Sequence, residues 1–129
     1  MEYMPYNEVT VIVEFYETEK GDRPAQDFLD SLDYKMRCKM IGEIKLLCEL
    51  GYLLRYPHSE KLTQHIFELR AKQGSNISRC LFFFDKGEKA ILTHGFTKKT
   101  EKTPRREIDR AESLRTDYLT RMERCNHGK

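Results

Sequence analysis

The chain has 129 residues, of which 39% are hydrophobic and 34% are charged. This length suits one domain whose core needs neither disulfides nor a metal, and the apolar content excludes an intrinsically disordered protein. We therefore expect a single domain over residues 1–129, with a folded core at about 8–122 and flexible ends.

Positive charge is concentrated in the second half of the chain. Residues 1–60 carry 7 Lys and Arg against 12 Asp and Glu, a net charge of −5, whereas residues 61–129 carry 16 against 9, a net charge of +7. The excess favours an anionic partner such as a nucleic acid, because a basic surface attracts phosphates. The alternative is that the last helix simply carries solvated charges.

The cysteines, histidines and apolar runs exclude several classes of protein. The four cysteines form no CxxC pair, which favours a reducing, cytoplasmic location. The four histidines lack the paired spacing of a zinc site, so we expect no metal, and nothing indicates a cofactor. No stretch approaches the roughly 20 apolar residues that span a bilayer, and we expect no membrane association.

The first half of the chain predicts one strand followed by two helices. Apolar residues alternate from Val9 to Phe15, as in a half-buried strand. A short helix is expected to begin at Pro24, and a second helix near Tyr34, with Gly51 placed to end it. Two consecutive helices of this kind form a hairpin that covers one face of a sheet.

The second half predicts three strands and a last helix. Residues 52–64 show no period and are expected to be a connecting loop, which is followed by strands over 66–71, 77–84 and 89–96. A final helix is expected to start at about Thr103 and Pro104. The predicted fold is α+β in the order β-α-α-β-β-β-α, with a small antiparallel or mixed sheet of about four strands, the helical hairpin on one face and a C-terminal helix.

Alternation along these strands assigns the cationic side chains to faces of the sheet. Arg70 falls on the same side as Glu68 and Lys72, and Arg79 falls beside Leu81. His94 shares a side with Leu92 and Phe96 in the same scheme. The sequence therefore predicts arginines projecting from central strands, with a run of lysines after the last of them.

Four segments carry a resemblance to a known family: FELR (67–70), SNISR (75–79), LFFFD (81–85) and HGFTKKTEKTP (94–104). In this order and spacing the chain resembles the phage-derived, HigB-type branch of the RelE/HigB toxin superfamily, over about residues 8–115. The resemblance implies a RelE-like fold and the toxin of a type II toxin–antitoxin system, which inhibits translation by cleaving mRNA on the ribosome. It also implies a helix-turn-helix antitoxin of the Xre/Cro type as partner.

Metal-independent RNA cleavage requires a 2′-hydroxyl to lose its proton and attack the adjacent phosphorus, while negative charge grows on the phosphoryl oxygens. Arg79 offers a bidentate fork to those oxygens and is predicted to be the main transition-state clamp, with Arg70 as its partner. The alternative is that each is a structural arginine, paired with Glu68 or Glu14.

Other residues of the basic string have two open interpretations. Lys98 and Lys99 are catalytic candidates, because adjacent ammonium groups repel each other and favour loss of a proton from one of them. Alternatively, they are surface lysines that bind phosphates. His94 is a candidate for proton transfer, with a partly buried, hydrogen-bonded histidine as the alternative.

Four further cations are predicted to bind RNA without taking part in the chemistry: Lys72, Lys102, Arg105 and Arg106. The whole chain then has two possible functions. It is either a ribosome-dependent endoribonuclease, or a non-catalytic binding module that pairs with a helix-turn-helix antitoxin or with RNA.

Overall fold

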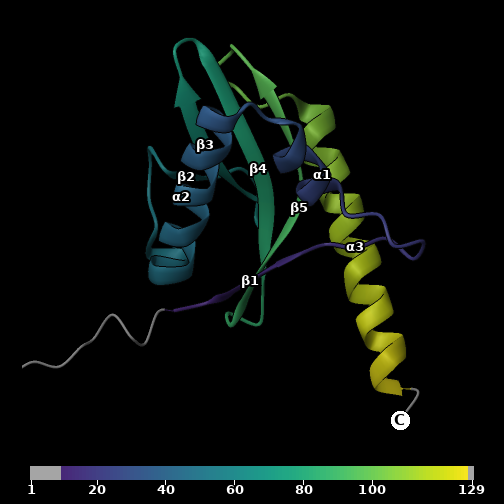
Figure 1. Cartoon of the computed structure of the whole chain (residues 1–129). Coiled ribbons are helices and arrows are strands. Elements are labelled where there is room, and N and C mark those ends of the chain that lie inside the picture. Colours follow the sequence, from purple (N-terminus) through teal and green to yellow (C-terminus); the bar gives the residue numbers. More distant parts are fainter. Residues whose placement is uncertain (1–9, 128–129) are drawn as a thin grey trace, which may run out of the picture.

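The structure is a computed structural model that describes residues 10–127 (Figure 1). Its elements in chain order are β1 (Ile12–Phe15), α1 (Pro24–Ser31), α2 (Tyr34–Leu50), β2 (Ser59–Lys61), β3 (Phe67–Gln73), β4 (Asn76–Asp85), β5 (Lys89–Lys98) and α3 (Arg105–His127). The predicted order of elements is confirmed, with one strand added. Val9 and the expected flexible residues 1–7 and 128–129 lie outside the described residues, whereas residues 123–127, which were also expected to be flexible, belong to α3.

The sheet has five strands in the order β1-β5-β4-β3-β2. β1 pairs in parallel with β5, and the other pairs are antiparallel, so the predicted α+β class with a mixed sheet is confirmed. The additional strand, β2, lies within residues 52–64, where a loop was predicted. That prediction was wrong because a strand of three residues with the sequence SEK has no apolar alternation to reveal it.

Two hydrophobic clusters lie on opposite faces of the sheet. Helices α1 and α2 pack on one face, as predicted for the helical hairpin, and α3 packs on the other (Figure 1). Alternation along β4 supplies both clusters: Cys80 and Phe82 face the hairpin, whereas Leu81 and Phe83 face α3. The central strand β4 is therefore buried on both sides, and its register with β3 and β5 sets which face of the sheet their side chains occupy.

Local signals set the helix boundaries as the sequence indicated. Pro24 occupies the first turn of α1, and Gly51 ends α2 with a φ of 55°. Asp33 caps α2, because its carboxylate accepts a hydrogen bond from the Met36 backbone N–H at 2.9 Å.

A β-bulge in β5 changes the faces that alternation predicted. Phe82 pairs with Leu92, but Leu81 pairs with His94, so Thr93 is an extra residue in the ladder. The Thr93 hydroxyl donates a hydrogen bond of 2.9 Å to the Leu81 carbonyl. Leu92 thus packs under the hairpin, while His94 faces α3. The prediction that these two residues share a side was wrong, because alternation alone does not reveal a bulge.

Candidate functional site

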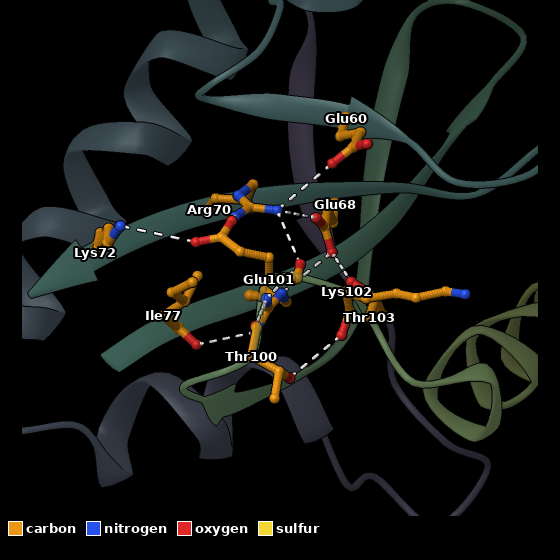
Figure 2. A network of polar contacts seen from close by, with 10 residues as sticks. Glu60, Glu68, Arg70, Lys72, Ile77, Thr100, Glu101, Lys102 and Thr103 are labelled. Carbon is orange, nitrogen blue, oxygen red and sulfur yellow. Dashed lines mark hydrogen bonds and ion pairs between the residues drawn. The ribbon is translucent and has the colours of Figure 1, made fainter. Parts of the chain in front are cut away.

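The cations of the predicted site meet on the sheet face that α3 partly covers. Arg70 lies opposite Arg79 in the register of β3 and β4, and Lys72 and Lys98 both lie opposite Ile77 in the neighbouring row. Residues 99–104, which link β5 to α3, lie against this face (Figure 2). The sheet and the linker together bring four of the predicted site residues into one region.

Arg79 lies in the interior, beneath the linker, with a relative exposure of 0%. Its Nη2 donates to the backbone carbonyls of Thr100 and Glu101, the latter at 2.8 Å, and its Nη1 donates to the Ile77 carbonyl at 3.4 Å. Its Nε lies 3.6 Å from Glu68 Oε1. The prediction that Arg79 offers its guanidinium to phosphate oxygens did not include this burial, because alternation shows a face but not the linker that folds over it.

Glu68 is the buried anion to which both arginines are directed. Its carboxylate accepts hydrogen bonds from Arg70 at 3.0 Å and from the Thr103 hydroxyl (Figure 2). Burial lowers the pKa of Arg79, and Glu68 offsets part of that effect. For Arg70, burial also lowers the pKa, but the bonds and charges of Glu68 and Glu101 outweigh it, so the pKa is raised. Both arginines therefore pair with Glu68, which is the pairing that the structural alternative names.

Arg70 reaches solvent where Arg79 does not. Glu101 spans two cations: its Oε1 lies 2.7 Å from Arg70 Nη2 and its Oε2 lies 3.8 Å from Lys72 Nζ (Figure 2). The Glu101 and Lys72 side chains are 64% and 62% exposed. Glu60 lies 3.5 Å from Arg70 at the same opening. A carboxylate therefore bridges two cations at the surface of the site.

Two hollows flank this ion pair, and Tyr56, Arg70 and Glu101 line both. The first hollow has a volume of about 450 Å³ and is also lined by Lys39, Glu43, Pro57, His58, Ala71, Lys72 and Ile77. The second hollow has a volume of about 460 Å³ and is also lined by Glu60, Lys61, Leu62, Glu68, Lys102, Thr103 and Ile108. Cations border both openings, which suits an anionic chain that crosses from one hollow to the other.

The comparison with protein families decides which family this is. The sequence matches the family model described as "Phage derived protein Gp49-like (DUF891)" over residues 27–116. The chain belongs to this Gp49-like family. Because that family is a RelE-like toxin family, the resemblance found in the sequence is confirmed at this level and indicates the toxin of a toxin–antitoxin pair.

A solved structure is also similar to this Gp49-like protein. It is a chain of the archaeal RelE–RelB complex from Pyrococcus horikoshii OT3, at 17% sequence identity and a TM-score of 0.43. The similar region covers 67% of this chain and 92% of that chain. No curated protein matches the sequence.

The remaining predicted residues of the Gp49-like protein occupy different places. Lys102 lines the second hollow, and Lys99 is exposed on the linker. Arg105 and Arg106 are exposed in the first turn of α3, where they pair with Asp109 and Glu107, and they line neither hollow.

His94 lies apart from both hollows. It is 1% exposed, and its Nε2 lies 3.0 Å from Glu107 Oε1 while its Nδ1 lies 3.3 Å from Thr93 Oγ1. Burial lowers the pKa of His94, and the hydrogen bond to Glu107 partly offsets this. The structure thus shows the alternative of a buried, hydrogen-bonded histidine.

Sequence reasoning missed several residues that line the first hollow, namely Lys39, Glu43, Tyr56 and His58. Lys39 and Glu43 belong to α2, whereas Tyr56 and His58 belong to the segment before β2. No spacing within one element therefore connects the two pairs. The sequence marked Tyr56 and His58 only as members of the connecting loop predicted over residues 52–64. In the described residues, 10–127, no helix is long and apolar enough to cross a membrane, and no group of acidic, histidine or cysteine side chains is arranged to hold a metal.

Proposed function

We propose that this protein is the toxin of a type II toxin–antitoxin system and acts as a metal-independent, ribosome-dependent mRNA endoribonuclease that inhibits translation in the cytoplasm. Membership of a RelE-like toxin family carries the proposal. The two hollows bordered by cations support it, because an RNA strand needs a channel with positive charge along its backbone.

We propose that Arg70 and Lys72 form the binding site for the scissile phosphate. Glu101 now places one carboxylate oxygen on each of these cations. A phosphodiester presents two non-bridging oxygens and can replace that carboxylate, with Arg70 then stabilising the charge that grows on phosphorus. Arg70 is accordingly the proposed clamp.

We propose that Arg79 positions the linker and does not contact the phosphate. Direct contact with phosphate would require its guanidinium to leave the carbonyls of Thr100 and Glu101. By holding those carbonyls it fixes the linker that carries Lys99 and Lys102. We propose that Lys98, Lys99 and Lys102 bind the RNA backbone close to the cleaved bond and that Arg105 and Arg106 bind it farther away, since all except half-buried Lys98 are exposed.

The proposed partner is a helix-turn-helix antitoxin, as expected for a toxin of this superfamily. The second candidate function is a non-catalytic module that binds this antitoxin or RNA. One observation favours it: three carboxylates, those of Glu60, Glu68 and Glu101, already lie within 3.5 Å of Arg70. If these carboxylates stay in place, Arg70 is not free to stabilise a transition state.

Mapping of mRNA ends after expression, and in a translation mixture with purified ribosomes, tests the proposal. We expect the native protein to arrest growth and to cut mRNA only when ribosomes translate it. Arg70→Gln should abolish both effects. The matched control is Lys45→Ala, which removes an exposed lysine of α2 that lines neither hollow. Intact mRNA with the native protein, together with retained antitoxin binding, would establish the binding module instead.

A further inference from the structure

The first hollow contains a histidine–carboxylate pair that the roles assigned so far do not use. His58 Nδ1 lies 2.9 Å from Glu43 Oε1, and the two side chains are 44% and 19% exposed. Glu43 projects from the long helix α2, whereas His58 comes from the segment that leads into β2. The contact therefore joins two elements that are anchored separately, and it orients the imidazole ring.

This pairing favours one tautomer of the neutral imidazole. An ionised Glu43 accepts a hydrogen bond, so Nδ1 carries the hydrogen and the lone pair of neutral His58 is left on Nε2. Within residues 10–127, Nε2 has no hydrogen-bond partner. A carboxylate that orients a histidine in this way leaves the second nitrogen ready to accept a proton.

A backbone hydrogen bond connects His58 to the proposed phosphate-binding site. The His58 carbonyl accepts a hydrogen bond of 3.0 Å from the backbone N–H of Arg70. Both side chains, together with Lys72, line the first hollow. A phosphate held by Arg70 and Lys72 would thus lie in the same hollow as the free nitrogen of His58.

The first hollow also offers a surface for a base. Tyr56 is 66% exposed, and its ring lies 5.8 Å from the guanidinium carbon of Arg70. Exposed aromatic rings next to cations bind single-stranded nucleotides by stacking. The volume of about 450 Å³ lies in the range of small-molecule sites and accommodates one nucleotide.

We propose that His58 is the general base of the cleavage reaction and that Glu43 is its positioning residue. This inference rests on the proposed endoribonuclease function. His58 Nε2 takes the proton of the 2′-hydroxyl, the O2′–P bond forms, and the P–O5′ bond breaks. Water then gives a proton to O5′, and the imidazolium returns its own proton to the solvent. The products are a 2′,3′-cyclic phosphate and a 5′-hydroxyl end.

The other described histidines do not suit this role. Both nitrogens of His94 face side-chain oxygens in the interior, and its ring lines neither hollow. His65 is exposed and also lies outside both hollows. His65→Ala is therefore the matched control for substitution of His58.

Single-turnover cleavage of mRNA on ribosomes, with RNA affinity measured in parallel, tests the proposal. We expect His58→Ala to cleave about 100-fold more slowly, as for loss of a general base, with RNA affinity within about twofold of native. Added imidazole should restore much of the rate, because it replaces the missing group. His58→Gln can still donate to Glu43, preserves the local fold, and should be equally slow but not rescued.

Glu43→Gln should slow cleavage less than His58→Ala does. It should also change the shape of the pH–rate profile, since the amide no longer fixes the tautomer of His58. Thermal unfolding of each variant separates misfolding from loss of chemistry. A native cleavage rate in both His58 variants would overturn the proposed role of His58 but not the endoribonuclease function. Loss of RNA affinity without loss of the cleavage rate in the bound complex would do the same. If the native protein does not cut mRNA on ribosomes, the endoribonuclease function fails and this role fails with it.

Discussion

Arg79 and Glu68 form an ion pair in the interior, with 3.6 Å between Nε and Oε1 and side-chain exposures of 0% and 1%. The pair joins neighbouring strands and, through Thr103 and the carbonyls of residues 100 and 101, holds the linker against the sheet. Because Arg79 is buried and bonded to the linker, its loss should cost more stability than the loss of a surface arginine.

Arg79→Ala should lower the free energy of unfolding by about 1–3 kcal/mol, because the carbonyls of Thr100 and Glu101 lose their donor while Glu68 keeps its bond to Arg70. Urea denaturation measures this. Arg105→Ala is the control, since its side chain is 76% exposed and its loss should change stability by no more than about 0.5 kcal/mol. Equal midpoints for Arg79→Ala and native protein would show that the pair is not structural.

Gly95→Ala should destabilise the protein by about 1–3 kcal/mol through overpacking. A Cβ at Gly95 would lie 2.2 Å from the Phe28 ring and 2.8 Å from the Arg79 carbonyl oxygen. The control is Gly42→Ala in the exposed middle of α2, where a Cβ meets nothing within 4 Å. That change should stabilise the protein by about 0.5–1 kcal/mol, because alanine favours helix. Thermal unfolding should move the two variants in opposite directions.

Stability should fall as the pH drops below about 6.5 because of His94. Burial lowers the pKa of His94 in the folded protein, whereas the unfolded chain takes up this proton at about pH 6.5. The stabilising contribution is complete above that pH and is lost toward the folded-state pKa, since the unfolded chain then binds more protons. Urea midpoints at pH 7.5, 6.5 and 5.5 should show a smaller pH dependence for His94→Gln than for the native protein. Identical slopes would contradict a buried neutral imidazole.

Glu101→Gln should raise affinity for a short RNA oligonucleotide about two- to fivefold, the range for removing one exposed ion pair. The Glu101 carboxylate occupies the position between Arg70 and Lys72 that phosphate must take. Fluorescence anisotropy measures the affinity, with Glu49→Gln on the outside of α2 as control. A fall in affinity would mean that Glu101 serves to orient Arg70 for RNA.

Alternation and capping signals in the sequence were sufficient for the order of all elements except β2, for the helical hairpin and for the faces of β3 and β4. They placed Arg70 beside Lys72 and Arg79 beside Leu81, as the structure has them. Burial of Arg79 could not be predicted this way, because it depends on where an aperiodic linker folds. The His58–Glu43 contact was equally hidden, since it joins a helix to an irregular segment by tertiary structure alone.

The bulge at Thr93 affects how relatives of this protein must be aligned. Since Thr93 is the extra residue in the ladder, His94, Phe96 and Lys98 keep the faces that they would have in a strand one residue shorter. A relative without the bulge therefore requires a gap at position 93. Without that gap, an alignment would transfer the end of this strand, including Lys98, to the wrong side of the sheet.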